Sequence, residues 1–153
     1  MARQSAGILL YRHGAAGLEV FLVHPGGPFW AGKEKDAWSI PKGLCAEGEE
    51  PELAARREFQ EETGQAAKGA LQLLGTFPQP SGKRVTAYAL KGDCDASKIR
   101  SNLFSLEWPP RSGRMQQIPE VDRAAWFPPS EAEKKLHKGL KPMIAKLKAT
   151  LDV

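Results

Sequence analysis

The sequence contains few cysteines and no long apolar stretch, and both scarcities exclude classes of protein. Cys45 and Cys94 are the only cysteines among 153 residues. Two are too few for a disulfide framework, so we expect reduced thiols and a cytoplasmic location. No apolar run reaches the roughly 18 residues of a membrane-spanning helix. The first residues also lack the apolar run and the cleavage site of a signal peptide.

Repeats and low-complexity segments are also absent, and the length fits one ordinary domain spanning residues 1–153. Apolar residues make up 41% and charged residues 26%, as in globular proteins. The formal charge is +4, from 22 basic and 18 acidic residues, which would suit a polyanionic partner. We nevertheless expect no nucleic-acid polymer, because the sequence shows no RNA-binding aromatic motif and no basic cluster beside one.

The charge is distributed unevenly along the chain. Residues 43–65 carry 2 basic and 7 acidic groups, a net charge of −5, whereas residues 130–153 carry 6 basic and 3 acidic groups, a net charge of +3. A compact acidic segment therefore lies within a basic chain. Its simplest interpretation is a solvated acidic helix, but the order of residues inside it favours a chemical role.

Hydrophobic patterns predict clustered strands with one helix between them and one at the end, which indicates an α+β fold. Pro51 and Gly64 bound the first helix, predicted over residues 51–63. Ser130 and Glu133 form a capping-box pattern for the last helix, which Pro142 kinks or divides. The predicted strands are 6–12, 17–24, 37–41, 71–77, 84–90 and 121–127, with a candidate strand at 104–108 and a loop at 109–119.

Three glutamates in the acidic segment have a spacing that suits a metal site. Glu58, Glu61 and Glu62 are spaced i, i+3, i+4, so a helix places them on one face. Like charges at this spacing repel by a few tenths of a kcal/mol per pair. A hard divalent cation such as Mg²⁺ would offset that repulsion. Gly43 and Gly64 also frame the segment more tightly than a solvated acidic face requires.

The same segment resembles the Nudix box, the signature motif of the Nudix hydrolase family. The matching positions within 22 residues are Gly43, Glu49, Arg57, Glu58, Phe59, Glu61, Glu62 and Gly64. Gln65 departs from the family pattern, which usually has an aliphatic residue there, so we expect weaker local packing. The resemblance implies a Nudix-type fold, a mixed β-sheet sandwiched between helices (α/β/α).

The resemblance also implies a set of metal ligands and an ion pair. Family members bind Mg²⁺ or Mn²⁺ through box carboxylates, a main-chain carbonyl and one more distant carboxylate. In this sequence those positions are Glu58, Glu61 and Glu62, the carbonyl of Lys42, and Glu120, with Asp122 as a weaker alternative to Glu120. Glu49 and Arg57 match positions whose family role is an ion pair that holds the loop against the helix.

Nudix enzymes hydrolyse a nucleoside diphosphate linked to another moiety, so the resemblance implies a pyrophosphohydrolase. Glu58 or Glu61 would act as the base, with Glu120 a third candidate and Arg57 in support. The segment W-S-I-P-K-G and the aromatic strand 84–90 are similar to the diadenosine polyphosphate hydrolase branch. The alternatives are nucleoside triphosphates, ADP-ribose and nucleotide sugars. A non-catalytic nucleotide sensor is the alternative of another class.

The substrate is expected to be a small nucleotide held by basic and aromatic side chains. Lys42 and Lys83 are the candidates for phosphate contacts, and Trp30 and Tyr88 are the candidates for stacking on a base. Solvated surface is the competing role for the lysines, and core packing competes for aromatic residues. The protein is expected to be a monomer or a homodimer that does not bind a membrane.

Overall fold

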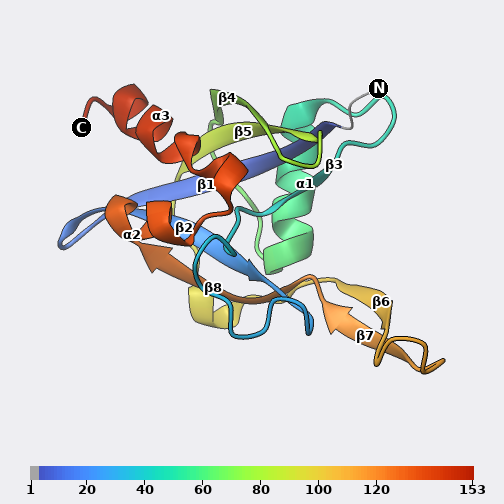
Figure 1. Cartoon of the computed structure of the whole chain (residues 1–153). Helices are drawn as coiled ribbons and strands as arrows, with labels where there is room; N and C mark the ends of the chain where they lie inside the picture. The colour runs from blue at the N-terminus through green and yellow to red at the C-terminus, as the bar shows by residue number, and fades with distance from the viewer. Residues whose placement is uncertain (1–3) are drawn as a thin grey trace.

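The computed structural model describes residues 4–153. Its main feature is a mixed six-stranded sheet with helices on both faces (Figure 1). The order along the sheet is β4-β5-β1-β2-β8, and β3 pairs with β1 beside this path. The parallel pair is β1 and β5, and the other pairs are antiparallel. The bounds are β1 Gln4–Gly14, β2 Gly17–Pro25, β3 Lys42–Leu44, β4 Gln72–Pro78, β5 Arg84–Lys91 and β8 Val121–Phe127.

The sheet separates two apolar cores. Helix α1 (Pro51–Thr63) covers one face, and helices α2 (Pro129–Lys135) and α3 (Pro142–Leu151) cover the other. Central strand β1 alternates between them, with Ile8 packed on the α1 side and Leu9 on the α3 side. Each such side chain contributes about 1.5–3 kcal/mol when fully buried. The α+β prediction, with its α/β/α layers, is therefore confirmed.

Helix α1 has the predicted bounds. It begins at Pro51, whose missing N–H costs nothing in the first turn, and it ends before Gly64. Gly64 adopts a left-handed conformation with φ 74°, and its N–H donates to the Gln60 carbonyl at 2.8 Å. Ala54, Ala55 and Phe59 form its apolar buried face, and Glu62 near its C-terminal end is buried as well.

Residues 37–41, predicted as a strand, form only isolated bridges. The Ser39 N–H and carbonyl each hydrogen-bond Val23 at 2.9 Å. The chain then leaves β2, and residues 42–44 pair with Ser5–Gly7 of β1 instead. The segment is extended, but it changes partners at Pro41, so no continuous ladder forms.

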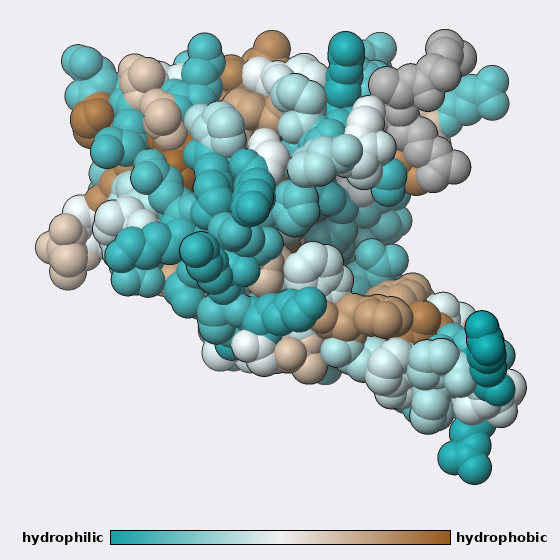
Figure 2. All heavy atoms as spheres, viewed as in Figure 1, coloured by the Kyte–Doolittle hydropathy of each residue, from teal (hydrophilic) through white to brown (hydrophobic). Residues whose placement is uncertain are grey.

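The prediction of a loop over residues 109–119 is wrong in part, because residues 115–119 form a strand. Strands β6 (Leu103–Glu107) and β7 (Met115–Pro119) pair in a separate two-stranded sheet, an arm that extends from the body (Figure 1). The short β7 sequence, Met-Gln-Gln-Ile-Pro, does not alternate between apolar and polar residues, and Ile118 is its only buried residue, so no pattern revealed the strand. Figure 2 shows hydrophobic side chains along this arm.

The last helix is divided, as Pro142 predicted. A 3₁₀ turn, η2 (Lys138–Leu140), separates α2 from α3, and Pro142 begins α3. The predicted capping box does not form, because α2 begins one residue before Ser130 and follows Pro128 without a side-chain cap. Two prolines with fixed φ start this helix in place of the predicted cap.

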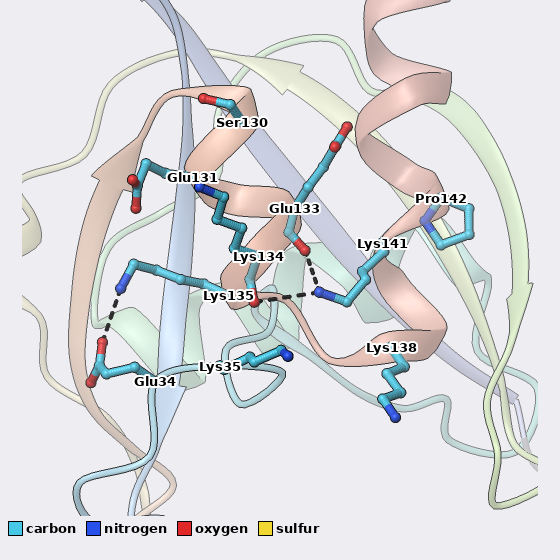
Figure 3. Close-up of a pocket in the computed structure, with 10 residues that line it drawn as sticks. All are labelled: Glu34, Lys35, Ser130, Glu131, Glu133, Lys134, Lys135, Lys138, Lys141 and Pro142. Atoms are coloured by element: carbon cyan, nitrogen blue, oxygen red, sulfur yellow. Dashed lines mark hydrogen bonds and ion pairs between the residues drawn. The ribbon is translucent and has the colours of Figure 1, made fainter.

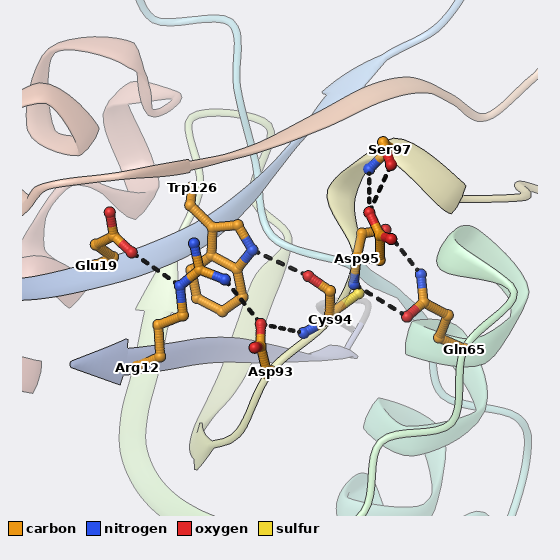
Figure 4. Close-up of polar contacts among 8 residues, drawn as sticks. All are labelled: Arg12, Glu19, Gln65, Asp93, Cys94, Asp95, Ser97 and Trp126. Carbon is orange, nitrogen blue, oxygen red and sulfur yellow. Dashed lines mark hydrogen bonds and ion pairs between the residues drawn. The ribbon is translucent and has the colours of Figure 1, made fainter. Parts of the chain in front are cut away.

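At Gln65, polar contacts take the place of the aliphatic packing usual in the family (Figure 4). The Gln65 amide donates to the Asp95 carbonyl at 3.0 Å, and its oxygen accepts from the Asp95 N–H at 3.3 Å. Nearby, the Trp126 indole donates to the Cys94 carbonyl at 3.0 Å, and Arg12 lies over the same indole. This network holds the segment after β5 against the end of α1.

Candidate active site

The three glutamates of α1 lie together but in different environments. Glu62 is 6% exposed, because it points toward the interior beside β3. The side chain of Glu58 is 13% exposed, and that of Glu61 is 41% exposed. The i, i+3, i+4 spacing therefore produces a gradient from a buried carboxylate to one open to solvent.

Arg57 organises the rim of this cluster. Its Nε and Nη2 donate to the two carboxylate oxygens of Glu49, each at 2.9 Å. Its Nη1 donates to Glu58 at 2.9 Å and to Glu61 at 3.1 Å, and Nη2 also reaches the Leu44 carbonyl at 3.0 Å. The hydrogen bonds from Arg57 lower the pKa of Glu49 to about 2. The predicted ion pair between Glu49 and Arg57 is present, and it fixes the loop to the helix.

Gly43 provides the space that Glu58 occupies. Gly43 lies in β3 opposite Ala6, and a Cβ atom at this position would overlap the Glu58 carboxylate. Any larger residue would push that carboxylate away from the strand. The first glycine of the motif is therefore required by close packing rather than by a turn.

The structure brings the distant Glu120 to the same cluster. Glu120 and Glu62 line a cavity of about 140 Å³ together with Lys42. The loop is fixed by backbone bonds, in which Glu120 donates to the Asn102 carbonyl at 2.9 Å and Asn102 donates to the Glu61 carbonyl at 2.8 Å. Asp122, the weaker alternative, instead contacts the buried His24 ring at 2.9 Å.

Burial raises the pKa of two of these carboxyl groups. The pKa of Glu62 is raised to about 8, chiefly by burial; Lys42 opposes the shift, and the charges of Glu58 and Glu120 favour it. Burial is also the main cause that raises the pKa of Glu58. Such a cluster favours a divalent cation, because the cation stabilises the ionised form of every oxygen around it.

The donor set fits Mg²⁺ or Mn²⁺, since all its members are oxygens. Within residues 4–153, no three acidic, histidine or cysteine side chains converge closely enough to hold an ion as they stand. Arg57 accounts for this, because it engages both Glu58 and Glu61. The raised pKa of Glu62 is the observation that favours a cation here.

A second cavity, of about 260 Å³, adjoins the carboxylates. Trp30, Lys42 and Lys83 line it, so the structure brings three of the predicted substrate-binding residues together. Tyr88 is not among them. It is 7% exposed in the core beside α1, whereas Trp30 packs on the core across the sheet. The predicted stacking of one base between Trp30 and Tyr88 is therefore not formed.

Among the other polar residues that line this cavity, sequence reasoning missed Gln79, Ser81 and His137. His137 lies where the last helix is broken, between α2 and η2, so its position depends on a break whose geometry the sequence did not reveal. Gln79 and Ser81 belong to the β4–β5 turn, which had no motif to mark it. No pattern in the sequence pointed to these positions.

The C-terminal segment also carries an open hollow rich in lysine, formed largely by α2 (Figure 3). Several of its cations already have partners. Lys135 donates to Glu34 at 3.1 Å, and Lys141 pairs with Asp36 at 2.9 Å and also donates to the Glu133 carbonyl. This hollow is therefore a partly neutralised surface, unlike the cavity beside Lys42.

Comparison with known proteins agrees with this site. Residues 1–147 match the family model described as the NUDIX domain. An 8-oxo-(d)GTP phosphatase of Mycolicibacterium smegmatis is 33% identical over 130 residues, which are 78% of this chain and 38% of that protein. An RNA pyrophosphohydrolase of Caulobacter vibrioides is 43% identical over 61 residues, which are 37% of this chain and 34% of that protein. The chain thus spans little more than a third of either relative.

Among solved structures, a C. elegans Ap4A hydrolase in a binary complex has a TM-score of 0.67 at 22% identity. The match covers 97% of this chain and 98% of that one, so the whole fold is shared. In the part of the chain that the structure describes, no helix has the length and apolar character needed to cross a membrane.

Proposed function

The chain belongs to the Nudix hydrolase family, and from this premise we propose that it is a Mg²⁺- or Mn²⁺-dependent pyrophosphohydrolase. It would cleave the phosphoanhydride bond of a nucleoside diphosphate linked to another moiety. The observation that carries this proposal is the cavity lined by Glu62 and Glu120, beside which Arg57 holds Glu58 and Glu61 of the same helix as Glu62.

Dinucleoside polyphosphates such as diadenosine tetraphosphate are the proposed substrates. The overall likeness to an Ap4A hydrolase supports this choice, as does the cavity with two lysines beside the carboxylates. The names of the two curated relatives support nucleoside triphosphates and RNA 5′ ends as alternatives. Trp30, half-buried at the cavity wall, is the candidate for stacking on the base.

The residues divide the work of hydrolysis among them. A bound divalent cation would neutralise the phosphate oxygens and acidify a water. Glu62, Glu120 and the Lys42 carbonyl would hold the cation, and the Lys42 ammonium would bind phosphate. Glu58 or Glu61, both hydrogen-bonded by Arg57, would accept a proton from the attacking water.

The deciding experiment is a phosphate-release panel. Purified protein with Mg²⁺ or Mn²⁺ is given dinucleoside polyphosphates, nucleoside triphosphates, ADP-ribose and nucleotide sugars. We expect hydrolysis that disappears in excess chelator and returns when the metal is restored. Full activity in excess chelator would refute the metal-dependent mechanism. Binding of a nucleotide without turnover of any compound would favour a sensor instead.

A further inference from the structure

The two cavities that meet at Lys42 have opposite charge. Glu62 and Glu120 line the smaller one, which also includes Lys42. The larger one has Lys42, Lys83 and His137 in its wall and no carboxylate at all among its lining residues. A ligand that lies in both cavities at once would therefore meet acidic groups at one end and basic groups at the other.

Hydrogen bonds from three distant segments build the basic cavity. Gln79 donates from its side chain to the Phe77 carbonyl at 3.0 Å and to the Gly139 carbonyl at 3.3 Å, so it joins the β4–β5 turn to η2. Its own N–H donates to the Lys83 carbonyl at 2.8 Å. The His137 N–H donates to the Trp38 carbonyl at 2.8 Å. These hydrogen bonds fix the backbone segments that carry the exposed Lys83 and the half-buried His137.

The cations of this cavity repel one another without a neutralising partner in its wall. Lys42 meets Glu62 and Glu120 in the carboxylate cavity, whereas Lys83 has no carboxylate among the residues that line the basic cavity with it. Burial lowers the pKa of His137, with Lys42 as the next cause. The ion pairs found among residues 4–153 use other cations. An anion entering the cavity would relieve this repulsion and gain charge-assisted hydrogen bonds.

Size limits what the anion can be. A volume of about 260 Å³ is below the roughly 300–1,000 Å³ of pockets that enclose a drug-sized ligand, so a compact group fits better than a whole nucleotide. The cavity shares Lys42, Pro25 and Ser39 with the carboxylate cavity, so the two are contiguous. A polyphosphate chain is both compact and continuous with the group being cleaved.

We propose that Lys83 and His137 form a subsite for a phosphate group next to the scissile anhydride, which selects substrates with three or more phosphates. This inference rests on the proposed function, because it assumes that the anhydride is cleaved at the carboxylate cavity. It separates the candidate substrates by chemistry. Triphosphates and dinucleoside polyphosphates fill the subsite, whereas ADP-ribose and nucleotide sugars, with two phosphates, leave it empty.

The test varies phosphate number alone. kcat/KM is measured for diadenosine compounds with two, three, four and five phosphates, on the wild type and on Lys83→Gln and His137→Gln. We expect kcat/KM of the wild type to rise at least tenfold from two phosphates to four. Each variant should reduce that ratio at least fivefold. Lys91→Gln changes an exposed lysine at the far end of β5, the strand that begins directly after Lys83; it is the matched control and should keep the wild-type ratio.

Inorganic tripolyphosphate and pyrophosphate give a second readout that does not need turnover. Calorimetry should show tighter binding of tripolyphosphate by the wild type, and Lys83→Gln should abolish the difference between the two anions. Equal kcat/KM across the series in an active enzyme would overturn the subsite and leave the proposed function intact. A uniform loss at every phosphate number would also overturn it, since that result describes a base-binding pocket. If no compound is cleaved, equal binding of the two anions overturns the subsite independently.

Discussion

The two cavities on either side of Lys42 differ in charge and also in how the chain builds them. Of the two carboxylates that line the acidic cavity, Glu62 shares two turns of one helix with Glu58 and Glu61, and Glu120 joins it from a single loop. The basic cavity takes its polar residues from the β4–β5 turn, the segment around β3 and the break in the C-terminal helix. The acidic site is therefore a local motif, whereas the basic one exists only in the folded protein.

The largest expected effect is on the acidic cavity. Glu58→Gln removes a carboxylate while keeping its shape, and the loss of a general base or metal ligand should lower kcat about 10²–10⁴-fold. Steady-state kinetics with Mg²⁺ measures it. Glu52→Gln, an exposed glutamate in the first turn of the same helix, is the control and should retain wild-type kcat. A decrease of less than threefold for Glu58→Gln would contradict the assignment.

Arg57→Lys tests whether the acidic cavity depends on its rim. The planar Arg57 guanidinium hydrogen-bonds Glu49 and also reaches Glu58 and Glu61, and the single ammonium of lysine cannot make all these contacts. Hydrogen bonds between charged groups contribute about 1.5–3 kcal/mol, so kcat should fall about 10–100-fold.

The matched control for Arg57→Lys is the neighbouring Arg56→Lys. Arg56 donates to the carbonyls of Ala67 and Gly69, away from the carboxylates. This variant should lower the melting temperature and retain kcat. Equal losses of kcat in the two variants would mean that the helix as a whole, and not the rim, is responsible.

Trp30→Ala separates base binding from phosphate binding at the basic cavity. Stacking of a base on an aromatic side chain is worth about 1–3 kcal/mol, so KM should rise about fivefold or more for every diadenosine compound, whatever its phosphate number. Tyr88→Phe, in the core across the sheet, should leave KM unchanged. A KM effect of Trp30→Ala confined to the longer compounds would place the tryptophan in phosphate binding instead.

The smallest effect concerns a carboxylate in the opposite situation from Glu62. Hydrogen bonds from Arg123 and Lys135 lower the pKa of Glu34 from its usual 4.5 to about 2. A pKa lowered in the folded state adds stability above about pH 4.5, and this contribution is lost as the pH falls toward 2. Glu34→Gln should therefore lower the melting temperature by a few degrees or less at pH 7, because the pair is partly exposed.

Melting curves from pH 7 down to pH 2.5 check this prediction. The difference between wild type and Glu34→Gln should shrink steadily below pH 4.5. Glu131→Gln, an exposed glutamate at the start of α2, serves as the control and should show no such pH dependence. A difference that stays constant with pH would show that Glu34 acts by packing rather than by charge.

The contrast between the cavities also explains what the sequence could predict. Helix α1, its Gly64 cap and the rim pair Glu49–Arg57 depend on residues close in sequence, and all three are present as predicted. His137 could not be placed, because its position depends on where α2 stops and on its bond to Trp38. Strand β7 was missed for a related reason, since its short sequence without alternation becomes a strand only by pairing with β6.

The parallel pairing of β1 with β5 has a consequence for how the protein folds. β1 pairs with β2 along a short hairpin, but Gln4 must also find Arg84, and the carboxylate helix lies between them in the chain. Closing such a long loop is slow, because its entropy is lost before its contacts form. Lys83, at the edge of β5, can meet Lys42 only after that closure. During synthesis, therefore, α1 can form early, but the two cavities should first become contiguous once β5 has emerged and docked.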